Sequence, residues 1–196
     1  MRRLLHLPLI FCTIFLLLSA PSVNAQTNET PTPEPDWRFG IIETYDAPLA
    51  ASEAGAAWTR IRFQWAAVQA EGPESWTPEV TEAQIEREVA NGRELVGLLI
   101  GIPDWARGDD DLPSGLYLPV DDPDNLWAAF VREAVTRYDG RINHWIIWNE
   151  PDIWDKETPG HTWDGTVEDF AQLQKVAYIV AKTANPEADN HLPAFP

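Results

Sequence analysis

Apolar and polar positions along the chain follow two periods in turn, which predicts strands and helices in alternation. Four short runs rich in aromatic and β-branched residues have the pattern of strands, at 37–44, 57–65, 94–102 and 142–150. The third of these runs is apolar almost throughout, which is typical of a strand buried on both faces.

Helices are predicted between and after these runs. A short one covers 48–56, and a second begins after Thr81, where Gln84 completes a capping box. A third opens at Asp122-Pro123, with proline at the first helical position. The last begins after Thr166, where Asp169 completes a second capping box, and ends near Asn185-Pro186.

Strict alternation of this kind implies parallel strands joined by right-handed crossovers. Two architectures fit, namely a doubly wound open sheet and a (β/α)8 barrel. The first strand is followed by "IIETYDAP" and not by a glycine-rich phosphate loop, so a dinucleotide-binding sheet is not supported. The residues therefore predict an α/β fold made of about four βα units, which form either a doubly wound sheet or part of a (β/α)8 TIM barrel.

The N-terminus predicts export. Residues 1–25 combine Arg2 and Arg3, an apolar core and a small-residue cleavage site, as a signal peptide does; retention as a membrane anchor is the alternative. Residues 26–36 are polar and proline-rich, which predicts a disordered linker. The α/β domain is expected over 37–188, with an irregular tail at 189–196. The predicted location is secreted, either periplasmic or extracellular.

Composition and net charge limit the classes of partner that the protein is expected to bind. The net charge of −17 disfavours nucleic acid and anionic membranes, so no nucleic acid and no stable membrane association after signal cleavage are expected. The single cysteine, Cys12, lies in the signal peptide, so thiolate metal sites are excluded from the rest. The run Asp109–Asp111 is interpreted as a solvated loop, and no cofactor or metal is predicted. Ten tryptophans can stack on sugar rings, which favours a carbohydrate partner; the oligomeric state is left open.

The stretch "INHWIIWNEPDIW" (142–154) carries the candidate chemistry. An aromatic strand ends in Asn149 and Glu150, and reactive groups of barrel enzymes lie at the carboxyl ends of strands. A carboxylic acid among tryptophans can keep its proton until it donates it to a leaving oxygen. Pro151 is expected to hold Glu150 in an extended backbone conformation. By strand alternation, Trp148 should share the face of Glu150.

This stretch resembles the fourth-strand motif of the clan A glycoside hydrolases, most closely that of families 39 and 5. The resemblance implies that the four βα units are part of a (β/α)8 TIM barrel. The resemblance implies that Glu150 is the general acid/base and that Asn149 binds a sugar 2-hydroxyl. It also implies that Arg60, in "GAAWTRIRFQW" (55–65), is the active-site arginine, although Arg62 shares its strand face. In "GIPDWA" (101–106), which resembles the third-strand end, Trp105 is expected to line the sugar site. Trp148 and Trp154 are the further candidate sugar contacts.

The mechanism of this clan needs a second carboxylate as nucleophile, which the resemblance places at the end of a seventh strand. Only four strands are predicted here, and the final "DNHLPAFP" has no strand pattern. The leading hypothesis is therefore the N-terminal half of a secreted retaining glycoside hydrolase for β-linked oligo- or polysaccharides, which lacks its nucleophile and is inactive alone. The alternatives are a non-catalytic carbohydrate-binding protein that uses exposed tryptophans and an α/β domain unrelated to carbohydrates.

Overall fold

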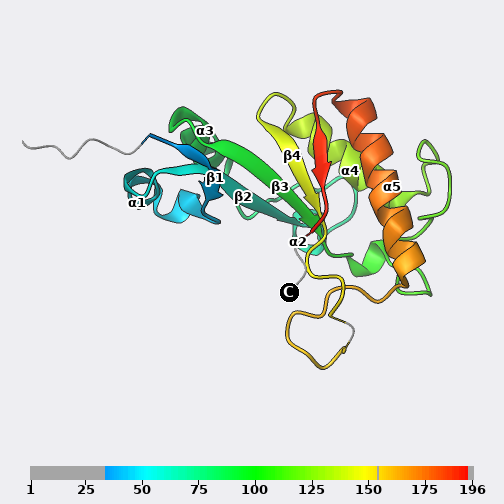
Figure 1. Cartoon of the computed structure of the whole chain (residues 1–196). Helices are drawn as coiled ribbons and strands as arrows, with labels where there is room; N and C mark the ends of the chain where they lie inside the picture. Colours follow the sequence, from blue (N-terminus) through cyan, green and yellow to red (C-terminus); the bar gives the residue numbers. More distant parts are fainter. Residues whose placement is uncertain (1–33, 154, 194–196) are drawn as a thin grey trace, which may run out of the picture. The chain divides into compact units, whose positions relative to one another are not determined.

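The computed structural model describes residues 34–153 and 155–193. Its centre is a five-stranded sheet in which every neighbouring pair is parallel and the strand order follows the sequence (Figure 1). The strands are β1 (Asp36–Gly40), β2 (Ala56–Gln64), β3 (Glu94–Ile100), β4 (Ile142–Ile147) and β5 (Asp189–His191). Five adjacent parallel strands that alternate with helices are part of a TIM barrel, so the predicted fold class is confirmed.

The predicted signal peptide (1–25), most of the predicted linker and Trp154 lie outside the described residues. Within the described ranges, every helix is too short or too polar to span a bilayer.

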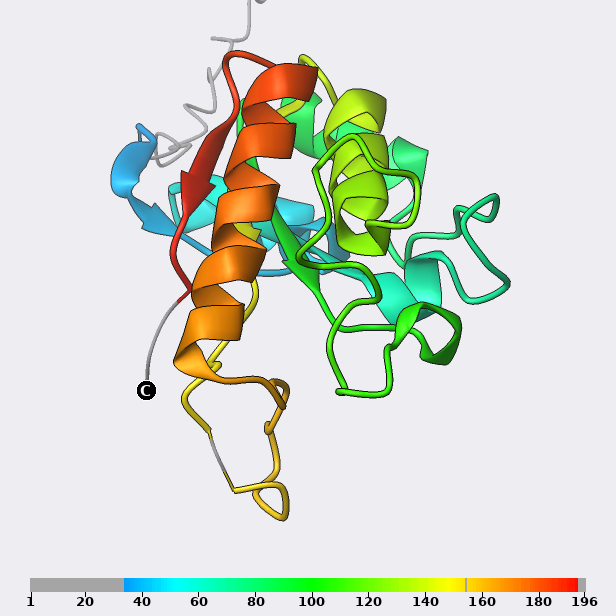
Figure 2. The same ribbon diagram turned by 90° about the vertical axis from the view of Figure 1, so that its right-hand side faces the viewer.

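Helices connect the strands. They are α1 (Pro48–Glu53), α2 (Trp65–Val68), α3 (Glu82–Ala90), α4 (Leu126–Arg137) and α5 (Val167–Ala184), with single 3₁₀ turns at Thr44–Asp46 and Asp104–Ala106. Both predicted capping boxes are confirmed, at Thr81 of α3 and Thr166 of α5. Helices α4 and α5 run side by side in Figure 2 and pack on each other.

Several predicted boundaries shift; the first predicted strand, for example, ends at Gly40 and not at residue 44, and two of the shifts have a clear physical cause. Helix α4 begins at Leu126 and not at Pro123, because the chain first turns at Asp122 and Asn125 then caps the helix by accepting a hydrogen bond from the Ala128 amide at 3.0 Å. The expected irregular tail also forms β5, which pairs with β4 from Asp189 to His191. An unpaired edge of β4 would leave backbone donors and acceptors unsatisfied, and β5 satisfies part of that edge.

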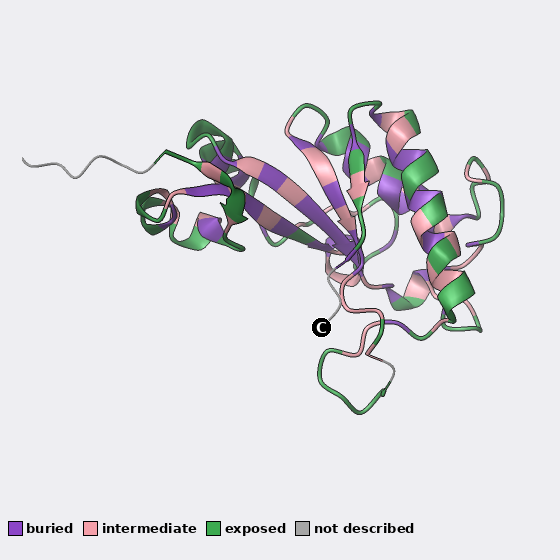
Figure 3. Ribbon diagram, viewed as in Figure 1, coloured by how far each residue is buried: buried purple, intermediate pink, exposed green. Residues whose placement is uncertain are grey.

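The main core lies between the sheet and the helices. Alternate residues of β2, β3 and β4 are buried on this outer face, among them Phe63, Leu99 and Trp145 (Figure 3). The ring of Trp65 stacks on Phe130 of α4 at 4.8 Å between centroids. Trp127 and Trp145 are fully buried. Aromatic packing against the sheet therefore supplies most of the large buried side chains.

The other face of the sheet is the inner face of the partial barrel. Trp58, Arg60, Val96 and Ile146 lie on it by strand alternation and are only partly buried. A hollow of about 350 Å³ opens on this face, lined by Trp37, Trp58, Glu94, Val96, His144, Ile146, His191 and Leu192. The inner face is thus less covered than the face that carries the helices.

Candidate active site

The carboxyl ends of β2, β3 and β4 meet at one edge of the sheet, and Asn149 and Glu150 follow the end of β4. The Trp148 amide donates to the Leu99 carbonyl at 2.8 Å, which extends the pairing with β3 by one residue. The backbone then leaves the pleat, because φ is +73° at Trp148 and +45° at Glu150. The candidate acid therefore belongs to a bend at the mouth of the partial barrel.

This bend corrects two predictions. The strand was expected to continue to Glu150, but it ends at Ile147. Pro151 was expected to hold Glu150 in an extended conformation, but its φ of +45° lies in the left-handed region. Local preference is overridden here by hydrogen bonds to β3 and to the loop that precedes α5.

The same bend changes the place of Trp148. Its indole is fully buried and meets the rings of Trp127 and Trp163 edge-on at 6.4 and 5.1 Å. Two-residue alternation does not carry across a residue with positive φ, so Trp148 and Glu150 do not share a strand face. In this structure the indole presents no ring face to a ligand, and the role of Trp148 as a sugar contact stays a prediction.

Asn149 and Glu150 are both partly exposed. The Asn149 carbonyl accepts a hydrogen bond from the Thr162 hydroxyl at 2.9 Å, and the Glu150 carbonyl accepts one from the Ile153 amide at 3.4 Å. Within residues 34–153 and 155–193, no hydrogen bond or ion pair engages the Asn149 amide group or the Glu150 carboxyl group. The two polar groups that the sequence singles out are thus adjacent and accessible to a ligand.

Arg60 lies on the inner face, in register with Val96 of β3 and His144 of β4. No hydrogen bond or ion pair joins it to Glu150. Arg62, the other candidate on this strand face, pairs with Glu79 at 3.1 Å. Arg62 is therefore engaged in an ion pair with Glu79. The active-site role of Arg60 stays a prediction.

Trp105 sits in the 3₁₀ turn after β3 and faces the helical layer. Its indole nitrogen donates to the Gln69 carbonyl at 2.7 Å, and its ring meets Trp65 edge-on at 5.9 Å. It lines a small hollow of about 180 Å³ together with Leu126 and Phe130 of α4. These contacts belong to the layer that covers the sheet, so the structure does not bring Trp105 to Glu150.

A mainly apolar cavity of about 400 Å³ is lined in part by the two residues that follow Glu150 in the chain. The sequence analysis did not predict this cavity. Its volume falls within the range of ligand pockets. Its lining comes from the two residues after Glu150, from the end of the loop that precedes α5 and from the first turn of α5: Pro151, Asp152, Trp163, Gly165, Thr166, Val167 and Phe170. The loop tryptophan Trp163, just before the predicted helix, was the available signal.

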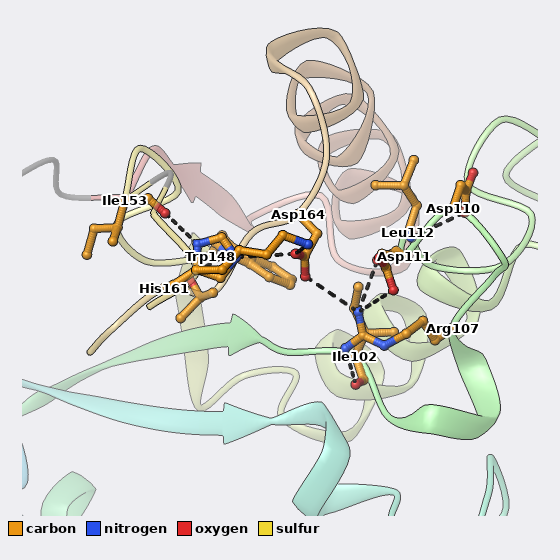
Figure 4. A network of polar contacts seen from close by, with 11 residues as sticks. Ile102, Arg107, Asp110, Asp111, Leu112, Trp148, Ile153, His161 and Asp164 are labelled. Atoms are coloured by element: carbon orange, nitrogen blue, oxygen red, sulfur yellow. Dashed lines mark hydrogen bonds and ion pairs between the residues drawn. The ribbon is translucent and has the colours of Figure 1, made fainter. Parts of the chain in front are cut away.

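A network of polar contacts holds the loop between β4 and α5 (Figure 4). The Asp164 carboxylate pairs with Lys156 at 2.5 Å, with His161 at 3.3 Å and with Arg107, from the loop after β3, at 3.8 Å. Lys156 is the main cause that lowers the pKa of Asp164, and Asp164 in turn raises the pKa of Lys156. His161 also contacts the Ile153 carbonyl through Nδ1 at 2.6 Å. The Asp164 carboxylate therefore links residues within the β4–α5 loop and joins this loop to the loop after β3.

Metal ligation finds no support in the described part of the chain, where no three His, Asp or Glu side chains are grouped to hold an ion. In the aspartate run, Asp111 lies 4.0 Å from the Arg107 guanidinium and Asp110 accepts from the Leu112 amide at 3.2 Å.

Comparisons with known proteins identify the fold. No protein-family model and no curated protein matches the sequence. Among solved structures, a family 39 glycoside hydrolase from Bacteroides cellulosilyticus matches 71% of this chain, with a TM-score of 0.52 and 18% identity. A family 5 glycoside hydrolase from Streptomyces cattleya, solved in complex with Manb1-4GlcNAc, matches 76%, with a TM-score of 0.53 and 15% identity. The fold is that of part of a (β/α)8 barrel, as found in these two glycoside hydrolases. This chain spans 26% and 38% of the length of those two glycoside hydrolases, respectively, and the likeness concerns their fold alone.

Proposed function

We propose that this chain is part of a secreted retaining glycoside hydrolase that acts on β-linked oligo- or polysaccharides, with Glu150 as the general acid/base. The observation that carries the proposal is the position of Glu150. It follows the end of β4 at the carboxyl edge of a parallel sheet, in a fold shared with glycoside hydrolases of families 39 and 5. Beside it, Asn149 offers a neutral amide to a sugar hydroxyl.

The proposed role needs a proton donor that reaches the leaving oxygen of the substrate. Glu150 is partly exposed and directly precedes Pro151 and Asp152, which line a cavity large enough for a sugar unit together with Trp163 and Phe170. Aromatic side chains suit the apolar faces of sugar rings. We infer that a saccharide bound in this cavity would bring its glycosidic oxygen to the acid.

Retaining hydrolysis also needs a nucleophile, about 5–5.5 Å from the acid/base. We assign no residue of this chain to that role. The chain alone should then bind and orient a glycoside without completing hydrolysis.

A non-catalytic carbohydrate-binding protein is the alternative from a different class. It requires tryptophan faces open to solvent, and two of the three tryptophans predicted for that role are held by the packing described above. Trp148 is fully buried, and Trp105 is hydrogen-bonded within the layer of α4. The binding-only function is therefore less well supported than the catalytic one.

An external nucleophile tests the proposal. Purified protein is incubated with phenyl β-glycosides, with and without sodium azide, and release of phenol and formation of glycosyl azide are measured. We expect turnover only with azide, because azide supplies the attack that the chain lacks. Replacing Glu150 by Gln should lower the azide-dependent rate by about 100-fold or more, the usual contribution of a general acid.

Glu157→Gln is the matched control, since it makes the same change at an exposed carboxyl group of the same loop, outside the lining of the cavity, and should leave the rate unchanged. Equal rates in wild type and Glu150→Gln, or no azide-dependent turnover at all, would contradict the role of Glu150. Robust hydrolysis without azide would contradict the proposal that the nucleophile is missing, but not the role of Glu150 as the acid.

A further inference from the structure

The backbone around the candidate acid adopts an uncommon conformation. Trp148 and Glu150 both have positive φ, at +73° and +45°, on either side of Asn149. Residues other than glycine pay for this conformation in steric energy, and it persists only where surrounding contacts impose it. The direction of the Glu150 side chain therefore depends on the contacts that keep φ positive at these two residues.

On the strand side, the holding contacts come from the sheet and from α5. The Trp148 amide donates to the Leu99 carbonyl, and the Gln174 side chain donates to the Ile147 carbonyl, each at 2.8 Å. These bonds fix the chain up to Trp148 but do not reach Asn149 or Glu150.

Beyond Trp148, a single hydroxyl makes the side-chain contacts. Thr162 Oγ1 accepts a hydrogen bond from Trp148 Nε1 at 3.1 Å and donates one to the Asn149 carbonyl at 2.9 Å. The two roles are compatible, because a hydroxyl has one proton to give and two lone pairs to receive. Among the described residues, no other side chain hydrogen-bonds the backbone of Asn149 or Glu150.

Thr162 is itself held in place. Its neighbour His161 contacts the Ile153 carbonyl, and Asp164, two residues on, pairs with Lys156 and with Arg107 from the loop after β3 (Figure 4). The hydroxyl thus belongs to a loop fixed at several points and not to a free segment.

We propose that Thr162 is the positioning residue of the candidate acid: its hydroxyl joins the buried indole of Trp148 to the Asn149 carbonyl and so sets the backbone conformation from which Glu150 projects. The functional meaning of this inference rests on the proposed role of Glu150. Thr162 touches no substrate in this account and acts only through the backbone of the motif.

Two variants separate the hydroxyl from the shape of the side chain. Thr162→Val keeps the volume and removes both hydrogen bonds, whereas Thr162→Ser keeps the hydroxyl. In isotope-labelled protein, the Cα and Cβ chemical shifts of Trp148 and Glu150 report positive φ, and hydrogen exchange of Trp148 Nε1 reports its bond. We expect Thr162→Ser to match wild type. In Thr162→Val, the Glu150 shifts should leave the positive-φ range and exchange at Trp148 Nε1 should quicken at least tenfold, with the shifts of α5 unchanged.

The catalytic readout uses leaving groups of different quality in the azide assay. A poor leaving group such as phenol needs protonation, whereas dinitrophenol does not. Thr162→Val should slow phenyl glycosides at least tenfold and leave dinitrophenyl glycosides within about twofold, and Thr162→Ser should slow neither. A merely structural role of Thr162 would slow both substrates together.

Wild-type shifts in Thr162→Val, or a Thr162→Ser variant that behaves like Thr162→Val, would overturn the proposal. If Thr162→Val does not fold, Thr162→Ala provides the same comparison with a smaller side chain. The spectra decide the role of Thr162 whether or not the protein turns over glycosides. Failure of the proposed function appears separately, as glycoside cleavage that is absent or indifferent to Glu150→Gln.

Discussion

A buried ion pair gives the sharpest prediction for the stability of the fold. Glu88 of α3 and Arg93, just before β3, lie 2.6 Å apart, with side chains 0% and 2% exposed. Arg93 also donates to the Ser52 hydroxyl at 2.9 Å and to the Pro48 carbonyl at 3.3 Å, so it fastens α1 to the start of β3. Glu88 further accepts a hydrogen bond from the Thr44 hydroxyl.

Arg93→Met removes the positive partner and leaves the Glu88 carboxylate buried, with Oε2 bonded to the Thr44 hydroxyl and Oε1 without a hydrogen-bond partner among the described residues. Breaking a buried pair from one side costs about 3–5 kcal/mol, a large share of the 5–15 kcal/mol that stabilises a typical domain. With an m-value of about 2 kcal/mol/M, the urea midpoint should fall by about 2 M.

Urea unfolding followed by tryptophan fluorescence measures this loss. The double variant Glu88→Leu/Arg93→Met removes both charges and should lose less stability than Arg93→Met alone, because no unpaired charge remains. A loss below about 1 kcal/mol in Arg93→Met, or a double variant less stable than the single one, would refute the reasoning.

Two further predictions concern packing and pH. A Cβ at Gly97 would lie 2.4 Å from the Trp145 ring, so Gly97→Ala should lower the free energy of unfolding by about 1–3 kcal/mol, and adding Trp145→Leu should recover part of it in the same urea assay. Lys156 lowers the pKa of Asp164 below its ordinary 3.8, so this carboxylate stabilises the folded loop above that value and loses its effect as pH falls through the lower folded pKa. Hydrogen exchange of residues 155–165 should therefore quicken on acidification below about pH 4, and Asp164→Asn should show fast exchange already at pH 6; an exchange rate independent of pH after correction for intrinsic rates would contradict this.

The elements of the fold follow from local signals in the sequence. The capping boxes at Thr81 and Thr166 fix two helix starts, because their side chains satisfy backbone amides a few residues away. The apolar run of β3 predicts a strand covered on both faces, and most of its residues are buried. Where two local signals compete, the prediction slips: Pro123 suggests the start of α4, but Asn125 provides the cap.

The site is less predictable because long-range contacts shape it. The sequence analysis extended the alternation of side chains between strand faces from β4 to Glu150. The backbone instead leaves the strand at Trp148, which is held by hydrogen bonds to Thr162 and Leu99. Neither partner is marked by a local pattern, so the burial of Trp148 could not be foreseen. The strand pairing of Asp189 with β4 has the same origin, since an open sheet edge can recruit a segment with little strand propensity.

The central claim is that a saccharide binds at the carboxyl edge of the sheet, against Asn149 and Glu150. Titrating isotope-labelled protein with β-linked oligosaccharides and recording backbone amide shifts tests it without requiring turnover. We predict the largest shifts at Asn149, Glu150 and the residues that line the adjacent cavity. Shifts confined to the inner-face hollow around Trp37 and Trp58, with the amides of Asn149 and Glu150 unmoved, would contradict the account.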